Sequence, residues 1–180
     1  TMHVGFGRED ARISVLENQL AAEGVILRHL DMDSFEDELR TIYPLVASCF
    51  RDNFLASPIS EEDFLEMNRG LRPYIQPELV LLAEHEDLLV GFAFAVPNWL
   101  QAQRGEEMDM LVLKTLAVHP EYRGKGLSTL LSERLGTVAY DLGYRRSIHA
   151  LMHEKNISRT MSQTRGTQSI RRYTLFAQNL

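Results

Sequence analysis

The spacing of apolar residues divides the chain into alternating helical and extended segments. Apolar residues recur at helical spacing in residues 9–22, 35–50, 64–71 and 127–139. Continuous or alternating apolar runs instead predict strands. These runs are "VILRHL" (25–30), "ELVLLAEH" (78–85), "LLVGFAFAV" (88–96), "MDMLVLKTLAV" (108–118), "RRSIHALMH" (145–153) and "IRRYTLFAQ" (170–178).

Capping and breaking residues set the expected ends of two helices. Asp33 with Glu36 predicts the start of one helix, and Ser60 with Asp63 predicts the start of the next. A side-chain oxygen at these positions satisfies backbone N–H groups that the helix leaves free. Pro44 falls inside the first of these helices and is expected to kink or split it.

The order of the segments predicts an α/β fold with a mixed sheet. Glu86 and Asp87 separate two apolar runs, which indicates an antiparallel hairpin, and a polar loop is expected from Asn98 through Gly105. The run 108–118 is apolar throughout, so we expect a central strand covered on both faces. Later strands alternate with helices, including a short helix at 158–164, which is typical of crossover connections.

Composition narrows the class of protein. The chain has 180 residues, 44% of them hydrophobic, which suits one domain of ordinary size. A net charge of −6 argues against nucleic acid or an anionic membrane as the main partner. Cys49 is the only cysteine, so no internal disulfide forms, and its apolar context favours a buried, inert thiol. No apolar run is long enough to span a membrane, and the sequence favours a cytoplasmic protein.

The stretch "LAVHPEYRGKGLSTLL" (116–131) carries the clearest chemical signal. Two glycines, Gly124 and Gly126, stand where a strand hands over to a helix. The start of a helix has free N–H groups and partial positive charge, and a glycine-rich turn lets those groups converge on an anion. Arg123 and Lys125 add full charges. The turn therefore predicts a phosphate site, although a glycine-rich turn with solvated cations is the alternative.

This stretch resembles the cofactor-binding motif of the GNAT superfamily of N-acetyltransferases. The motif is read here as Arg123-x-x-Gly126-x-Ser128, with Ser128 in place of the usual Gly or Ala. The order of elements over residues 25–180 is also similar to the family. The resemblance implies an α/β fold with a mixed, mostly antiparallel sheet, splayed central strands and helices on both faces. Residues 1–24 would be an N-terminal helical extension to a single N-acetyltransferase domain.

The resemblance implies acetyl-CoA as acyl donor, with no metal. The backbone of residues 116–118 would pair with the pantetheine arm, and the turn would hold the pyrophosphate. The expected cofactor-binding residues are Leu116, Ala117, Val118, Arg123, Gly124, Lys125, Gly126, Leu127, Ser128, Thr129, Asn156 and Ser158.

The reaction implied is direct attack of a primary amine, of a small molecule or peptide, on the thioester. An oxyanion donor would be a backbone N–H near Leu116 or Ala117. The family's usual tyrosine acid is replaced by Ser162, so the candidates are Ser162 through a water, Tyr173, or unassisted departure of the thiolate. The candidate bases are Asp109, Glu106, Glu107, Glu84 and His85.

Several alternatives remain open at this stage. Acceptor binding is expected from Asn53, Phe54 and Trp99, although Trp99 is equally well explained as a packing anchor. The helix in residues 1–24 would cover either a dimer interface or the cofactor's edge. A CoA-binding sensor with little catalysis is the main functional alternative, and a structural domain that binds nothing is the third.

Overall fold

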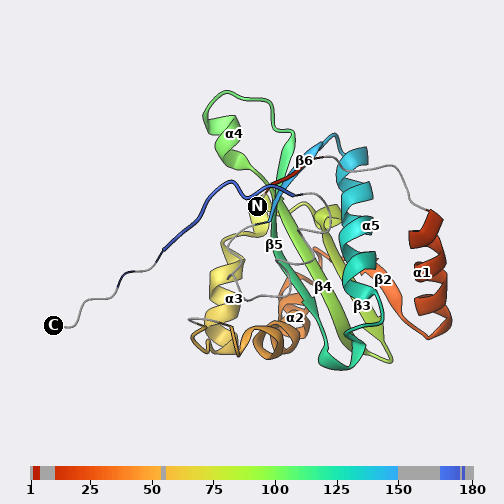
Figure 1. The fold of residues 1–180 in the computed structure, drawn as a ribbon. Coiled ribbons are helices and arrows are strands. Elements are labelled where there is room, and N and C mark those ends of the chain that lie inside the picture. Colours follow the sequence, from red (N-terminus) through yellow and green to blue (C-terminus); the bar gives the residue numbers. More distant parts are fainter. Residues whose placement is uncertain (1, 5–10, 54–55, 150–166, 175, 177–180) are drawn as a thin grey trace.

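The structure of the protein is a computed structural model that describes residues 2–4, 11–53, 56–149, 167–174 and 176. The described residues form one sheet of six strands in the order β1-β6-β5-β4-β3-β2 (Figure 1). All neighbouring strands are antiparallel except β5 and β6, which are parallel. The strands are β1 (Met2–Val4), β2 (Ile26–His29), β3 (Val80–His85), β4 (Leu88–Pro97), β5 (Met110–Val118) and β6 (Arg146–His149). The predicted mixed, mostly antiparallel sheet is confirmed.

Helices cover both faces of this sheet, with α1 and α5 on one face and α2 and α3 on the other (Figure 1). Successive strand residues point to opposite faces. Leu81 and Ala83 of β3 therefore join the apolar cluster under α1 and α5, whereas Val80 and Leu82 join the cluster under α2 and α3. The helices are α1 (Ala11–Ala22), α2 (Phe35–Phe50), α3 (Glu61–Arg69), α4 (Trp99–Gln103) and α5 (Leu127–Asp141), with short 3-10 turns η1 (Arg72–Tyr74), η2 (Pro77–Leu79) and η3 (Pro120–Tyr122).

The parallel pair β5 and β6 is joined along only part of its length. Pairing with β6 runs from Met110 to Leu113. From Lys114 to Val118, β4 is the only neighbour of β5 within the described residues. The β4–β5 register also shifts here and leaves Lys114 without a partner, which is a β-bulge and bends the strand. Lys114 is exposed, so the expectation that this strand is covered throughout is wrong.

The start of α2 differs from the prediction, whereas that of α3 agrees with it. The N-cap of α2 is Ser34, whose side chain makes no capping hydrogen bond. Asp33 instead donates its backbone N–H to Asp31 Oδ1 (2.9 Å). At α3, Ser60 Oγ accepts the backbone N–H of Asp63 (3.1 Å), as expected of a cap.

Three further expectations are corrected. Helix α2 continues through Pro44, so the expected split does not occur. The polar loop after β4 contains the short helix α4. Residues 170–174 and 176 are not in a strand, and they run off the body of the molecule (Figure 1). The sheet position beyond β6 is filled by β1, in which Met2 pairs with Ile148.

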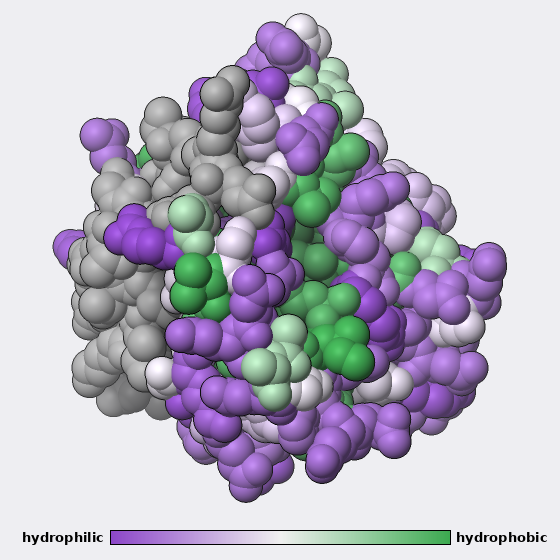
Figure 2. Space-filling view, turned by 90° about the vertical axis from the view of Figure 1, so that its right-hand side faces the viewer, coloured by the Kyte–Doolittle hydropathy of each residue, from purple (hydrophilic) through white to green (hydrophobic). Residues whose placement is uncertain are grey.

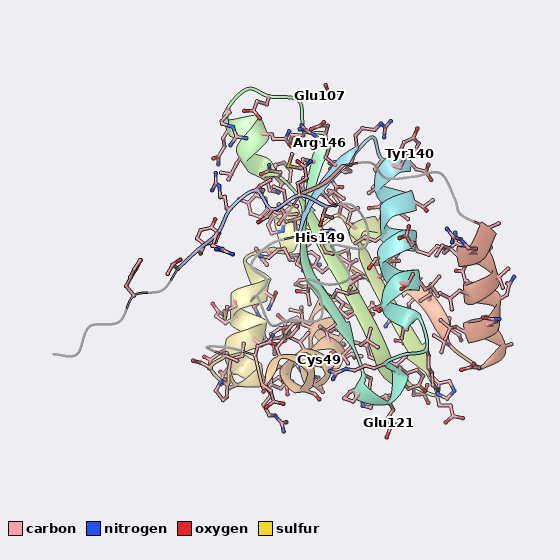
Figure 3. All side chains as sticks on the ribbon, in the orientation of Figure 1. Cys49, Glu107, Glu121, Tyr140, Arg146 and His149 are labelled. Carbon is pink, nitrogen blue, oxygen red and sulfur yellow. The ribbon has the colours of Figure 1, made fainter. Side chains whose placement is uncertain are left out.

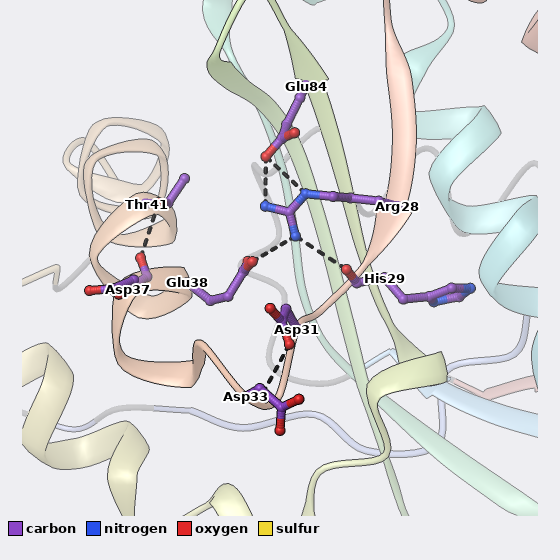
Figure 4. A network of polar contacts seen from close by, with 8 residues as sticks. All are labelled: Arg28, His29, Asp31, Asp33, Asp37, Glu38, Thr41 and Glu84. Carbon is purple, nitrogen blue, oxygen red and sulfur yellow. Dashed lines mark hydrogen bonds and ion pairs between the residues drawn. The ribbon is translucent and has the colours of Figure 1, made fainter.

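An ion-pair network ties α2 to the β2 edge of the sheet (Figure 4). Arg28 Nη1 donates to Glu38 Oε1 (2.8 Å), and Arg28 Nη2 donates to Glu84 Oε1 (2.6 Å). The hydrogen bond with Glu84 raises the pKa of Arg28 further above its usual value. Glu38 is 8% exposed, and its Oε2 has no hydrogen-bond partner among the described residues. The network therefore fixes where α2 lies across the sheet.

Candidate active site

The turn between β5 and α5 is wrapped by two left-handed glycines. Gly124 has φ +79° and Gly126 has φ +87°, backbone values that side-chain-bearing residues rarely adopt. Gly126 is the N-cap of α5, so the chain enters the helix directly from this left-handed residue. The predicted glycine-rich hand-over from strand to helix is therefore confirmed.

The turn leaves a run of backbone N–H groups without partners. Arg123 donates its N–H to Pro120 O (3.2 Å), and Thr129 donates its N–H to Gly126 O (2.9 Å). Between them, the N–H groups of residues 124–128 donate no hydrogen bond within the described part of the chain. They lie at the N-terminus of α5, where the helix dipole also favours an anion. Thr129 can contribute its hydroxyl to such a site, whereas its N–H is already used.

The two cations of the turn are held by neighbouring groups. Arg123 Nε donates to Val118 O (3.4 Å). Lys125 Nζ lies 4.9 Å from the ring centre of Tyr122 and 3.8 Å from Glu23 Oε2. Glu23 follows α1, and its proximity to the turn could not be read from the sequence because it depends on how α1 packs. Both cations are exposed, so an anion at the turn can draw on their charge.

Beyond its last described pair with β6, at Leu113, strand β5 directs some backbone groups to the side away from β4. The N–H of His119 donates to Val90 O (2.9 Å), and hydrogen-bonding residues alternate along an antiparallel pair. Ala117 therefore points its backbone groups toward β4, whereas Leu116 and Val118 point theirs away. Cys49 Sγ lies 3.3 Å from Val118 O, consistent with this orientation. Of the two expected oxyanion donors, the geometry favours Leu116 over Ala117.

Cys49 contacts β5 at Val118, and the sequence did not predict this contact. It is half-buried near the end of α2 and donates its thiol hydrogen to the strand carbonyl (Figure 3). Sequence context indicated only a buried, inert thiol. Its contact with β5 depends on the angle at which α2 crosses the sheet, and no motif encodes that angle.

The candidate base Asp109 is held in an ion pair. Arg146 Nη2 donates to Asp109 Oδ1 (2.6 Å), and Gln101 Nε2 donates to the same oxygen (2.8 Å). The hydrogen bond from Arg146 holds the pKa of Asp109 below its usual value. Arg146 and Glu121 lie at opposite ends of the molecule in Figure 3, so Asp109 is far from the turn. This geometry makes Asp109 a poor proton acceptor.

Two of the other candidate bases, Glu106 and Glu84, are engaged in ion pairs. Glu106 receives hydrogen bonds from Arg104, the nearer at 2.6 Å, which lower the pKa of Glu106. Glu84 belongs to the Arg28 network. The His85 ring lies 5.8 Å from that of Tyr122, at the end of the sheet where the turn lies. His85 is therefore the predicted base whose side chain lies nearest the turn.

Part of the predicted site falls outside the described residues, namely Phe54, Asn156, Ser158 and Ser162. The candidate acid Tyr173 is described. Its side chain is 70% exposed, and its segment leaves the body of the molecule (Figure 1). The structure does not bring Tyr173 to β5.

The expected acceptor-binding residues are described at two positions. Asn53 is half-buried just after α2, and its N–H donates to Phe50 O (3.1 Å). Trp99 begins α4, is 39% exposed, and makes an edge contact with Tyr74 at 6.1 Å between ring centres. Tyr74, which contacts Trp99, is exposed, and so is Leu100, the next residue in the chain. This aromatic patch lies toward the α4 end of the molecule (Figure 1).

The described residues form neither a metal site nor a membrane-spanning helix. No three or more His, Cys, Asp or Glu side chains are grouped as metal ligands in the described part. Among the described helices, none has the length and apolar character needed to cross a bilayer.

Comparison with known proteins gives the family. The model of the acetyltransferase (GNAT) family matches residues 39–159. The aminoglycoside N-acetyltransferase AAC(6')-Iy, in complex with a CoA-containing bisubstrate analogue, has a similar fold with TM-score 0.61, at 15% identity over 87% of this chain and 99% of that one. An aminoglycoside 6'-N-acetyltransferase from Acinetobacter baumannii has TM-score 0.59, at 21% identity over 87% and 99%. At these identities the likeness shows the fold.

A curated relative matches a shorter region. The bacterial ceramide synthase of Caulobacter vibrioides is 28% identical over 75 residues, which cover 42% of this chain and 20% of that protein. The chain thus matches only about a fifth of the relative's length.

Proposed function

Because the chain belongs to the acetyltransferase (GNAT) family, we propose that it transfers an acetyl group from acetyl-CoA to a primary amine. One observation carries the proposal: the N–H groups of residues 124–128 donate no hydrogen bond within the described part of the chain. A run of this kind at a helix start fits a pyrophosphate, which needs several donors converging on adjacent oxygens. The CoA-containing complex of a fold neighbour supports the same ligand class.

The edge of β5 that faces away from β4 supports a place for the pantetheine arm. Leu116 and Val118 direct backbone groups toward this edge, beyond the last described pair of β5 with β6 at Leu113, although the Val118 carbonyl also accepts from Cys49 and Arg123. An extended amide chain can add to such an edge as a strand does. We assign the oxyanion-stabilising donor to the N–H of Leu116, which points toward this edge. Such a preorganised donor stabilises charge that develops on the carbonyl oxygen in the transition state.

The amine must lose a proton, and the described candidate bases lie away from the N–H of Leu116. Asp109 is paired with Arg146 at the far end of β5. His85 lies beside Tyr122, directly before the turn, on β3, which β4 separates from β5. We therefore assign removal of the proton to water. Asn156, Ser158 and Ser162 remain proposed contacts of the arm and the thiolate, from the family motif.

The proposal is tested by placing a carboxylate in the cradle through Ser128→Asp. An acidic residue in the first turn stabilises a helix by roughly 0.3–1 kcal/mol. The same charge repels a pyrophosphate at Coulomb distances of a few ångströms, so acetyl-CoA affinity should fall by about tenfold or more. Calorimetric titration measures the affinity and thermal unfolding measures the stability. Ser128→Asn, which has similar volume and no charge, is the matched control.

The expected signature is weaker binding together with unchanged or higher stability, which a folding defect cannot produce. Normal acetyl-CoA binding by Ser128→Asp, with wild-type binding demonstrated, would show that the turn is not the phosphate site. If the wild-type protein itself fails to bind, the proposed function fails.

Turnover distinguishes the transferase from a CoA-binding sensor. Release of free thiol should be followed with a panel of amines on protein that binds acetyl-CoA. An aminoglycoside belongs in the panel because two fold neighbours are aminoglycoside acetyltransferases. A long-chain aliphatic amine belongs there because Tyr74, Trp99 and Leu100 expose apolar surface. Binding with no turnover on any amine would favour the sensor.

A further inference from the structure

The helix α1 packs against the start of α5. Its residues Ile13, Leu16 and Leu20 belong to or pack on the apolar cluster that contains Leu127 and Leu131 of α5. An ion pair between Glu17 and Arg134 joins the two helices farther along. Helix α1 precedes the region matched by the family model, which begins at residue 39. Its packing is therefore a property of this chain's N-terminal segment.

The contact reaches the anion-binding turn itself through Leu16. A Cβ placed on Gly126 would lie 2.8 Å from Leu16 Cδ1 and 3.1 Å from Leu16 Cδ2. The Leu16 side chain thus rests on the backbone of Gly126, the residue that enters α5. A Cβ on Gly124 would meet nothing within 4 Å. Helix α1 therefore supports the turn at its second glycine and leaves the first glycine uncovered.

Glu23, which follows α1, forms an ion pair with Lys125 of the turn. Glu23 Oε2 lies 3.8 Å from Lys125 Nζ, while the ammonium also sits over the Tyr122 ring. Within the described residues, Glu23 is the carboxylate paired with this lysine. A bound phosphate would therefore compete with Glu23 for Lys125 and would meet its negative charge.

The described contacts of α1 bear on its role. In Figure 2, which faces the side on which α1 lies, apolar side chains are bordered by polar ones. Leu16 and Glu23 both lead from this segment to the turn. Of the two roles open to residues 1–24, a dimer interface or a cofactor edge, the contacts favour the second.

We propose that residues 11–23 support the cofactor site and set its affinity. Leu16 is a positioning residue that holds Gly126 and so keeps the N–H groups of residues 124–128 aimed at one anion. Glu23 sets the affinity by holding Lys125 back from that anion. The inference rests on the proposed function, in that the anion is the pyrophosphate of acetyl-CoA.

The positioning role of Leu16 is tested by Leu16→Ala with Ile13→Ala as matched control. Both residues are half-buried on α1 and pack on the same cluster, but the three atoms nearest to a Cβ on Gly126 all belong to Leu16. Both variants should lower thermal stability to a similar extent. Only Leu16→Ala should raise the dissociation constant for CoA, by about fivefold to twentyfold, and Leu16→Met should restore it. Equal CoA affinity in the two alanine variants would overturn the role.

A ligand-free measurement separates this inference from the proposed function. Backbone ¹⁵N relaxation at Gly124 and Gly126 reports motion of the turn without any cofactor. We expect increased mobility in Leu16→Ala and not in Ile13→Ala. If wild-type protein bound no CoA but this difference appeared, the support by α1 would stand and only the assignment of the ligand would fail. No difference would refute the support itself.

The role of Glu23 is tested by Glu23→Gln, with Glu17→Gln as control. Glu17 pairs with Arg134 on the body of α5, away from the turn. Removing the charge of Glu23 should tighten CoA binding by about twofold to fivefold, and added salt should shrink the gain. Glu17→Gln should leave affinity unchanged. Unchanged or weaker CoA binding by Glu23→Gln would refute its role.

Discussion

The two glycines of the turn allow the packing of α1 to be measured by a pair of alanine substitutions. Gly124→Ala and Gly126→Ala both place a Cβ on a left-handed residue, with φ of +79° and +87°. The surroundings differ, because only the Cβ at Gly126 meets Leu16, at 2.8 Å. The difference between the two variants therefore isolates the contact with α1.

The magnitudes follow from the geometry. A left-handed conformation destabilises a side-chain-bearing residue by roughly 1–2 kcal/mol. Loss of backbone freedom in the unfolded chain offsets about 0.4–1 kcal/mol of this. Gly124→Ala should therefore lower the free energy of unfolding by about 1 kcal/mol. Overpacking against Leu16 adds about 1–3 kcal/mol, so Gly126→Ala should lower it by about 2–4 kcal/mol.

Urea denaturation measures the change in the free energy of unfolding for both variants. The change follows from the shift in the midpoint when the slope of the free energy against urea concentration stays constant. The combination Gly126→Ala with Leu16→Ala provides an internal check, because removing Leu16 relieves the clash and makes the two effects less than additive. Equal destabilisation by the two glycine substitutions, or simple additivity in the double variant, would show that Leu16 does not rest on Gly126. The same clash means that a tryptophan at Gly126 would disturb α1 as well as any ligand.

Two further predictions concern charge. Arg28→Met should lower the free energy of unfolding by roughly 3 kcal/mol, because it leaves the buried carboxylate of Glu38 without its cation. Arg40→Met breaks only exposed ion pairs and should change the free energy of unfolding by less than about 1 kcal/mol. Similar values for the two variants in urea denaturation would contradict the network. Arg146 lowers the pKa of Asp109, so this pair stabilises the fold above the ordinary carboxyl pKa of about 3.9 and is lost as the pH falls below it. The stability difference between wild type and Asp109→Asn should therefore be constant from neutral pH to about pH 5 and shrink below about pH 4, and a difference that stayed constant at low pH would refute the pairing.

The sequence predicted most of the elements because each carries a strong local pattern. The helical spacing of Leu127, Leu131 and Leu135 and the continuous apolar runs of β3, β4 and β5 leave little ambiguity. Three-residue β1 offers too few positions for any periodicity. The segment 170–178 has a strand-like composition, yet its described residues find no partner strand. Composition reports propensity, whereas pairing depends on the rest of the sheet.

The site was predictable where chemistry depends on local sequence. The Arg-Gly-Lys-Gly turn fixes both the wrap of the backbone and the nearby charge, so residues 123–128 could be read directly. The orientation of Leu116 could not, because it depends on the register between β4 and β5. The pairing of Asp109 with Arg146 and the contact of Leu16 with Gly126 each join segments that are distant in sequence. Single-sequence patterns carry no signal for such pairs.

Among the described strands, the two at the ends of the sheet order come from the first 29 residues of the chain. β1 pairs with β6 at one edge, and β2 pairs with β3 at the other. During synthesis from the N-terminus, β2 can pair as soon as the β3–β4 hairpin has emerged, whereas Met2 must wait for Ile148. Pairing across such a long stretch of chain is slow because closing the loop is entropically unfavourable. We therefore expect the β2 edge to close early and β1 to dock last, so that the nascent domain carries its first strand unpaired until the end of folding.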